Sequence, residues 1–266
     1  MTHPFRRNRF FRNTLPDANV SELGNIRSLH LGTPTIQSSM NINQPSELVL
    51  SYSRAMMSWL LFAEQLPATH HPNWFGRWVV LLFGWMEYLP DSQQVAVEIN
   101  PQVIQIARTS FALDFEGQNF DIVEADGAEY IQIMRGNTDV ILVDGFDGIQ
   151  IIDELVGEPF FHDCRQALSA NGIFATNWWS GDKRYSLFMQ RLRTVFDNRV
   201  LEVPATTHGN VAVLAFNFTP ELNLEKLKKR ANKLSDRYGL DFFRMLFDAK
   251  GSNRHNGKQF QFESKP

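Results

Sequence analysis

The chain has 266 residues, of which 43% are hydrophobic and 21% are charged, and its formal net charge is −3 at pH 7. This ordinary globular composition excludes a wholly disordered or fibrous chain, and a single cysteine, Cys164, excludes a disulfide framework and a Cys-based zinc cluster. No apolar run approaches the roughly 20 residues that span a membrane. The charge argues neither for nor against nucleic acid. We expect a soluble, cytoplasmic protein with no metal and with no nucleic-acid or membrane partner.

The N-terminal part is expected to hold a small β-structure. Residues 1–24 carry scattered arginines and polar residues but no apolar segment, so we expect a flexible arm rather than a secretory signal. Apolar and polar residues alternate on both sides of Gly32-Thr33-Pro34, which predicts a β-hairpin over Ile26–Met40. Pro45-Ser46-Glu47 is typical of a helix start, and the apolar stripe after it predicts a helix to Leu60. Residues 25–66 form this expected unit.

Residues 67–218 alternate strand patterns with helix patterns, which predicts an α/β domain with a mainly parallel sheet. The predicted strands cover 94–99, 121–124, 139–143 and 173–177, and the predicted helices cover 101–110, 127–134, 159–169 and 185–196. Residues 199–203 and 210–217 predict a closing antiparallel pair.

The last part, residues 219–266, is expected to be a basic helical extension. It holds 11 Lys and Arg against 6 Asp and Glu. Thr219-Pro220-Glu221 predicts a helix start and Gly239 its end. We expect a solvated appendage helix, with a docking segment as the alternative.

Three acidic residues follow predicted strands, namely Glu98, Asp126 and Asp144. Ligands of open α/β sheets bind beyond the carboxyl ends of the strands. Glu98 can accept the hydroxyls of a ribose, Asp126 can border an adenine, and Asp144 faces the reacting end of the ligand. Each acid alone is equally well explained as a polar strand end. The three in order predict a nucleoside pocket.

The segment Val143-Asp144-Gly145-Phe146-Asp147-Gly148 places two carboxylates three residues apart in a loop after a buried strand. Both can face one cavity, which would suit a cationic ligand, and the glycines allow a tight turn. The alternative is a turn that merely favours Asp and Gly.

With these residues the sequence resembles the spermidine synthases, or polyamine aminopropyltransferases, particularly their short bacterial relatives. The resemblance covers about residues 25–218. It rests on the hairpin with Gln37, the segment Leu48–Met57, Val97-Glu98-Ile99, Ala125-Asp126-Gly127, the Asp144 loop and Thr207-His208-Gly209. It implies a methyltransferase-type, Rossmann-like sheet behind a small N-terminal β-hairpin domain, and a homodimer.

The resemblance also implies a reaction, in which an aminopropyl group passes from decarboxylated S-adenosylmethionine to putrescine or a similar amine. Decarboxylated S-adenosylmethionine (or S-adenosylmethionine) is a co-substrate, and no tightly bound cofactor is expected. Glu98 would hold its ribose, and Asp126 with Gly127 would border its adenine.

At the amine end, the resemblance implies that Asp144 acts on the attacking nitrogen as the catalytic residue. Gln37 and Tyr52 would line the polyamine site, and Asp147 would help to hold the second ammonium. A carboxylate suits the first role because it can orient an amine and accept its proton.

Two short departures from the family pattern concern the ligand. Tyr52-Ser53-Arg54 stands where the family commonly has Tyr-His-Glu, which predicts a basic group near the polyamine side. Glu98-Ile99-Asn100 has Asn where Asp is common. We expect ribose binding to survive that change.

A larger departure covers residues 70–80, where the family has an apolar strand and a glycine-rich loop. This segment would instead fill the nucleoside pocket with bulky side chains. Its sequence is His70-His71-Pro72-Asn73-Trp74-Phe75-Gly76-Arg77-Trp78-Val79-Val80. Trp is encoded only by TGG, so a frame one base later gives Gly at each Trp. That frame permits Ile-Thr-Gln-Ile-Gly-Leu-Gly-Gly-Gly-Ser, and the original frame returns by about Phe83.

Our hypothesis is a pair of compensating frameshifts in the gene or in its record. The alternative is a diverged but real segment, with His70 and His71 as surface residues rather than metal ligands. The function therefore stays open between an aminopropyltransferase, intact or impaired at this loop, and a catalytically inactive or regulatory relative. An S-adenosylmethionine-dependent methyltransferase is the third possibility. It would share Glu98 and Asp126 without needing the hairpin or the Asp144/Asp147 pair.

Overall fold

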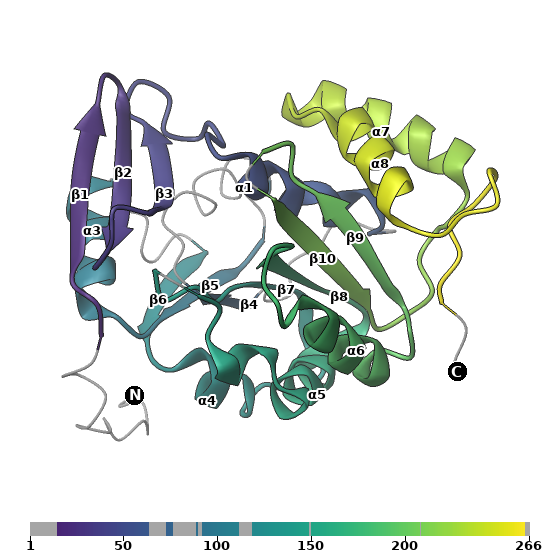
Figure 1. Ribbon diagram of the computed structural model, residues 1–266, viewed down its shortest axis with the longest axis horizontal. Helices are drawn as coiled ribbons and strands as arrows, with labels where there is room; N and C mark the ends of the chain where they lie inside the picture. The colour runs from purple at the N-terminus through teal and green to yellow at the C-terminus, as the bar shows by residue number, and fades with distance from the viewer. Residues whose placement is uncertain are drawn as a thin grey trace.

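The computed structural model describes residues 15–63, 73–76 (backbone only), 89, 92–111, 119–148, 150–207 and 209–263. These residues form two sheets (Figure 1). The first has three strands in the order β1-β2-β3, and the second has seven in the order β6-β5-β4-β7-β8-β10-β9. The predicted α/β fold with a small N-terminal β-structure is confirmed.

The N-terminal sheet consists of β1 (Ala18–Leu23), β2 (Ile26–Leu31) and β3 (Ile36–Asn41), all antiparallel. Strands β2 and β3 are the predicted hairpin. The expectation of a flexible arm is wrong for Ala18–Leu23, because this segment pairs with β2 along its whole length. Most side chains of β1 are exposed, so the segment lacks the apolar alternation by which a strand is recognised.

The helix predicted from Pro45 begins later. Helix α1 covers Ser51–Met56 and continues as a short 3₁₀ helix, η2, over Met57–Leu61. Glu47 does not start a helix, because its carboxylate accepts a hydrogen bond from Asn41 Nδ2 at 2.6 Å and so closes a loop.

In the large sheet the strands β4 (Asn73–Gly76), β5 (Gln94–Glu98), β6 (Phe120–Glu124), β7 (Thr138–Asp144) and β8 (Leu168–Trp179) are parallel. Strand β10 (Asn210–Phe216) runs antiparallel to both β8 and β9 (Val200–Pro204). The strands predicted from the apolar runs and the closing antiparallel pair are confirmed. Strand β7 is buried between β4 and β8, as its continuous apolar run predicts.

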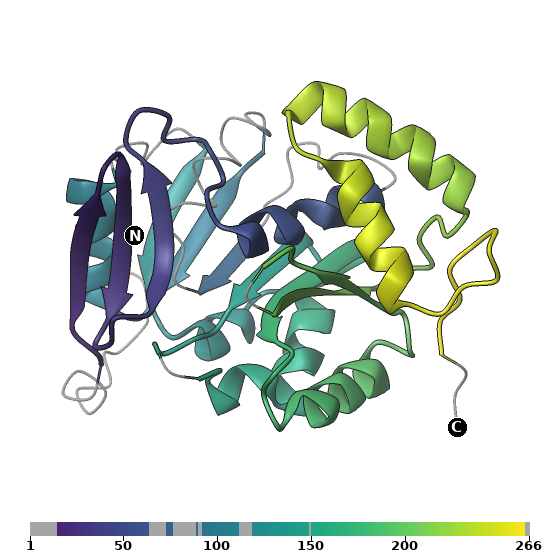
Figure 2. The same ribbon diagram turned by 45° about the horizontal axis from the view of Figure 1, so that its top comes forward.

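Helices cover both faces of this sheet (Figure 1, Figure 2). On one face lie α4 (Gly127–Ile131), α5 (Glu158–Ala167) and α6 (Tyr185–Val195), packed on alternate strand residues such as Ile141 and Phe174. The other face is covered by α1 and η2 with α3 (Pro101–Ser110), α7 (Leu224–Tyr238) and α8 (Phe242–Ser252). A further 3₁₀ helix, η3, covers Asp153–Val156. No described helix is long and apolar enough to cross a membrane.

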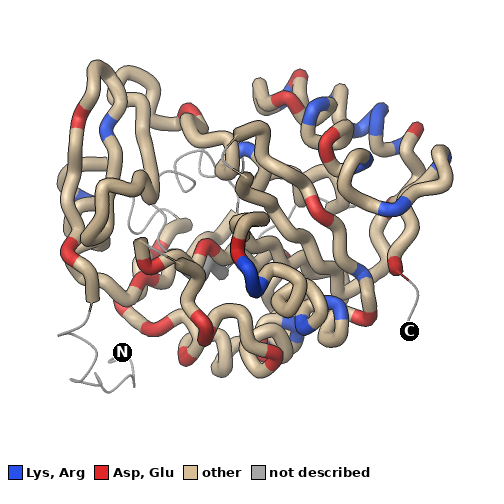
Figure 3. The backbone as a smooth tube through the Cα atoms, viewed as in Figure 1, with Lys and Arg blue, Asp and Glu red and all other residues tan. Residues whose placement is uncertain are grey.

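The C-terminal extension is part of the core, so the expectation of a solvated appendage is wrong. The extension contributes fully buried side chains to the hydrophobic core on one face of the large sheet, namely Leu227 and Ala231 of α7 and Phe260, which follows α8. Lys and Arg follow one another along α7 (Figure 3). The helix begins at Leu224 with Asn223 as its N-cap rather than at Thr219. It ends, as predicted, before Gly239, whose φ is +66°.

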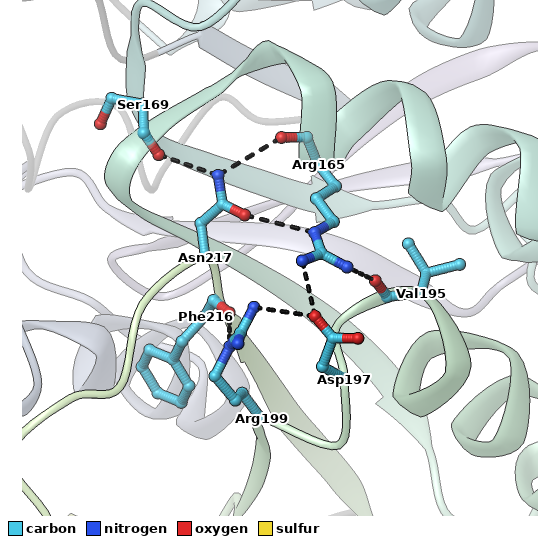
Figure 4. A network of polar contacts seen from close by, with 7 residues as sticks. All are labelled: Arg165, Ser169, Val195, Asp197, Arg199, Phe216 and Asn217. Atoms are coloured by element: carbon cyan, nitrogen blue, oxygen red, sulfur yellow. Dashed lines mark hydrogen bonds and ion pairs between the residues drawn. The ribbon is translucent and has the colours of Figure 1, made fainter.

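A polar network fixes the sheet edge at which β8 begins and β10 ends (Figure 4). Arg165 Nη2 lies 2.7 Å from an Asp197 carboxylate oxygen, which also contacts Arg199 at 3.2 Å. Asn217, directly after β10, donates from Nδ2 to the Ser169 carbonyl at 3.0 Å. The network joins the ends of α5, α6 and β10, and it leaves the opposite edge for the candidate site.

Candidate active site

The carboxyl ends of the parallel strands meet at one edge of the sheet, and the three predicted acids lie there. In the strand register Glu98 is opposite Glu124, and Asp144 is opposite Gly76. Asp126 follows β6 by two residues. The structure thus brings Glu98, Asp126 and Asp144 to the edge at which open α/β sheets bind their ligands.

Glu98 is buried, with 6% of its surface exposed. Its Oε1 accepts a hydrogen bond from the backbone N–H of Asn100 at 2.6 Å. Asn100 in turn caps α3 through Gln102 N at 3.0 Å and donates from Nδ2 to the Pro16 carbonyl at 2.9 Å. The amide donor is one that an aspartate would lack, so Asn100 ties the N-terminal segment to the strand end that holds Glu98.

Asp126 is the N-cap of α4. Its Oδ1 accepts from Ala128 N at 2.7 Å and from Glu129 N at 3.4 Å, and Gly127 is the first residue of the helix. Both residues are half-buried. Capping alone explains an aspartate here, so the adenine-side role remains a prediction.

The predicted amine end is built from three elements. Asp144, at the end of β7, is 7% exposed and accepts at Oδ1 from Asn177 Nδ2 of β8 at 3.1 Å. The single phenolic proton of Tyr52, from α1, lies between two acceptors, the Gln37 backbone carbonyl at 2.8 Å and the Asp144 carboxylate. Burial and the neighbouring Asp144 carboxylate raise the pKa of Tyr52 well above its ordinary value, so Tyr52 stays protonated. The structure therefore brings Gln37, Tyr52 and Asp144 together.

Asp147 lies in a compact turn after Asp144. Its Oδ1 accepts from Gln150 N at 2.9 Å, and its own N–H donates to the Gln150 carbonyl at 3.0 Å. The Ile152 N–H closes the loop on the Gly145 carbonyl at 2.8 Å. The turn holds the Asp147 carboxylate in place, and its contact with an ammonium remains a prediction.

This loop docks on the N-terminal hairpin through Gly148. Thr33 Oγ1 donates to the Gly148 carbonyl at 3.2 Å. The φ of Gly148 is +105°, and a Cβ there would lie 2.4 Å from the Leu31 carbonyl oxygen. Only glycine tolerates both the positive φ and the close Leu31 carbonyl, because it has no Cβ. Gly148 therefore allows the Asp144 loop to pack directly on the hairpin.

Arg54 takes a different place from the one predicted. Residues two apart on a helix do not share a face, and Arg54 lies across α1 from Tyr52. Its guanidinium donates to the Leu48 and Val49 carbonyls, the latter at 2.8 Å. It also lines a pocket of about 70 Å³ with Asp241, the N-cap residue of α8. The prediction of a basic group near the polyamine side is therefore wrong for Arg54.

The segment that departs most from the family pattern is described only in part. The backbone of Asn73–Gly76 forms β4 between β5 and β7, which is the place expected for the first strand. Trp74 and Phe75 therefore lie within the strand. His70, His71 and residues 77–80 lie outside the described residues, and so does His208. Thr207, next to His208, contacts Ser51 of α1 through their hydroxyls at 2.6 Å.

Asn177 is a site residue that sequence reasoning missed. It closes the predicted strand 173–177, although β8 itself continues to Trp179, and only acids were considered as ligand-facing strand ends. An uncharged amide that closes an apolar strand pattern indicates a ligand-facing residue as well as an acid does. Its partner Asn210, at the start of β10, can be found only from the antiparallel pairing.

The mainly parallel sheet closed by antiparallel β10, with acids at its carboxyl edge, defines an α/β protein of the methyltransferase type. A profile of the spermine/spermidine synthase domain matches residues 82–204. The polyamine aminopropyltransferase of Neisseria meningitidis serogroup A is 63% identical over 260 residues, which cover 97% of this chain and 98% of the relative. The chain belongs to this family.

Two solved structures share the fold. A probable spermidine synthase of Corynebacterium glutamicum gives a TM-score of 0.69 at 13% identity, with 94% of each chain covered. A spermidine synthase in complex with the transition-state analogue AdoDATO gives a TM-score of 0.59 at 17% identity, with 87% of this chain and 82% of that chain covered.

Proposed function

We propose that the chain transfers an aminopropyl group from decarboxylated S-adenosylmethionine to putrescine or a similar diamine. The observation that carries the proposal is the buried Asp144 under the N-terminal hairpin, held by Asn177 and Tyr52. Full-length similarity to a protein named polyamine aminopropyltransferase supports it. A related fold in complex with AdoDATO supports a co-substrate of the S-adenosylmethionine type.

In the proposed reaction, the nitrogen of the amine attacks the aminopropyl carbon next to the sulfonium sulfur. A C–N bond forms, the C–S bond breaks, and its electron pair returns to sulfur, so neutral methylthioadenosine leaves. The amine must give up a proton to attack, and Asp144 accepts it directly or through water. Much of the rate would come from holding the two substrates in line.

The remaining residues divide between the two substrates. Glu98 would accept the ribose hydroxyls, and Asp126 with Gly127 would border the adenine. Tyr52 and Gln37 would line the amine end, with Asp147 as the partner of the second ammonium. A sulfonium and a diammonium are both cations, so the acids at this edge would favour both substrates.

The test is a product assay with three readouts. Release of methylthioadenosine from decarboxylated S-adenosylmethionine and putrescine is the expected result. Methyl transfer from S-adenosylmethionine without aminopropyl transfer would identify a methyltransferase. Absence of both, with no nucleoside binding, would identify an inactive relative. A homodimer belongs to the same proposal and is measured by sedimentation equilibrium.

A further inference from the structure

A short chain of amide hydrogen bonds leads from Asp144 into the antiparallel part of the sheet. Asn177 Nδ2 donates to Asp144 Oδ1 at 3.1 Å, and Asn177 Oδ1 accepts from Asn210 Nδ2 at 3.0 Å. Asn177 is 3% exposed. The three residues come from three adjacent strands, β7, β8 and β10.

The order of these bonds fixes which end of the Asn177 amide faces Asp144. A side-chain amide has one accepting oxygen and one donating nitrogen. Since Asn210 supplies a donor, the oxygen of Asn177 turns to Asn210 and the nitrogen turns to Asp144. A flip of Asn177 alone would set its nitrogen against the Asn210 donor and its oxygen against Asp144, so the two amides would have to turn together.

A buried carboxylate needs such a donor if it is to stay ionised. Burial disfavours the charged form of a carboxylate, whereas a hydrogen bond donated to the charged form favours it. Among the described residues, Tyr52 of α1 is a titratable group that contacts Asp144; it is neutral at physiological pH, and its hydroxyl is a second donor toward the carboxylate. Asp147 in the same loop and Glu98 at the same sheet edge are further acids, and neither can donate a hydrogen bond to Asp144 while it is ionised.

From this geometry we propose that Asn177, oriented by Asn210, is a positioning residue that holds Asp144 ionised and aimed at the amine. This inference rests on the proposed function, because a protonated Asp144 could not accept the proton of the attacking amine. It gives the uncharged residues Asn177 and Asn210 an indirect role in the proposed reaction. Asn177 would act through Asp144, and Asn210 would act through Asn177.

The decisive measurement is the titration of the Asp144 carboxyl by ¹³C NMR of carboxyl-labelled protein, with Asp144→Asn assigning the signal. In Asn177→Leu, which keeps a similar volume, we expect this titration to move to higher pH by about one pH unit, a tenfold change in proton affinity. In Asn210→Ala the amide of Asn177 can flip, so we expect a smaller shift in the same direction. The acid limb of the pH profile of kcat/KM should move with each titration.

Asn217→Ala is the matched control. It removes the amide that donates to the Ser169 carbonyl at the other edge of the same sheet (Figure 4). We expect a lower melting temperature and an unchanged titration of Asp144. If Asn177→Leu does not fold, Asn210→Ala decides, since it leaves Asn177 in place.

An unchanged titration in Asn210→Ala and in any folded Asn177→Leu protein would overturn the inference. The NMR titration needs no turnover, so it also separates the two proposals. An inactive wild-type chain with a shifted titration would remove the proposed function and keep the role of Asn177. An active wild-type chain whose variants show no shift of the Asp144 titration would keep the proposed function and remove the role of Asn177.

Discussion

Asp144 is the residue on which the proposed chemistry depends most. Asp144→Asn keeps the size of the side chain but removes the proton acceptor. We expect kcat to fall by about 10²- to 10⁴-fold, the range of general-base catalysis. Methylthioadenosine binding, measured by calorimetry, should be retained because the proposed nucleoside contacts, Glu98 and Asp126, are left unchanged.

The matched control for this prediction is Asp139→Asn on the same strand. Asp139 accepts from Ser169 Oγ at 3.1 Å near the opposite end of β7. We expect this variant to keep its turnover. Full activity in Asp144→Asn would contradict the assigned role.

A second residue-scale prediction concerns stability at high pH. The Tyr185 phenol donates to a Glu202 carboxylate oxygen at 2.6 Å. Burial, the larger cause, and the negative charge of Glu202 raise the pKa of Tyr185 far above 10. The unfolded phenol releases its proton near pH 10 while the folded one keeps it. The free energy of unfolding that this group contributes is therefore present below pH 10 and is lost progressively above it.

In Tyr185→Phe we expect the alkaline slope of the free energy of unfolding to fall by up to about 1.4 kcal/mol per pH unit above pH 10. The ring keeps its edge contact with Trp178, so at pH 8 the loss should be limited to about 1 kcal/mol for the missing hydrogen bond. Urea unfolding between pH 8 and pH 11 gives both values. A slope equal to that of the wild type would show that Tyr185 ionises in the folded state as it does in the unfolded one.

At the scale of elements, the contact between the N-terminal hairpin and the Asp144 loop is the feature most exposed to a single change. In Gly148→Ala the new Cβ meets the Leu31 carbonyl at 2.4 Å, so the loop and the hairpin must shift apart. We expect kcat/KM for the amine to fall by about tenfold or more, because the Asp144 loop then loses its support. Nucleoside binding should change less. Steady-state kinetics with varied amine gives the comparison.

Gly24→Ala separates this effect from backbone strain. Gly24, in the turn between β1 and β2, has a φ of +61° and open space around a new Cβ. We expect this variant to lose about 1 kcal/mol of stability and to keep its kinetics. If both variants lower kcat/KM equally, the docking contact has no special role.

How well elements can be predicted from this sequence depends on what stabilises them. Strand β7 follows from its own apolar run, because burial on both faces requires one. Strand β1 does not, because its stability comes from pairing with β2 while its side chains face solvent. In α7 the apolar residues Leu227, Ala231 and Leu234 recur at helical spacing, but the high charge of the segment favoured a solvated helix.

The same distinction holds for the site. Acids that end strands can be placed at one edge from topology alone, so Glu98, Asp126 and Asp144 could be predicted. The contacts of Asn177 with Asn210 and of Gly148 with Leu31 join residues far apart in the sequence. They depend on how the strands and the hairpin pack in three dimensions, which no local pattern specifies.

At the scale of the whole molecule, residues 70–80 are the point where sequence and fold disagree. The backbone of Asn73–Gly76 lies between β5 and β7 in the sheet, and Gly76 lies opposite Asp144. By the family resemblance, the glycine-rich run expected here is where a nucleoside would meet the backbone most closely. The family profile matches only from residue 82, whereas the overall similarity to the Neisseria relative spans nearly the full chain.

We therefore predict that source DNA shows one base gained and another lost between codons 66 and 83. The shifted frame supplies glycines where Trp74 and Trp78 now stand, and glycine lets a ligand approach the backbone. A binding comparison tests the consequence directly. Replacing residues 70–79 by Ile-Thr-Gln-Ile-Gly-Leu-Gly-Gly-Gly-Ser should tighten methylthioadenosine binding by about tenfold or more, which is about 1.4 kcal/mol. Equal affinity of the two proteins, with codons that stand as translated, would mean that the bulky segment is native and that the nucleoside is held without a glycine loop.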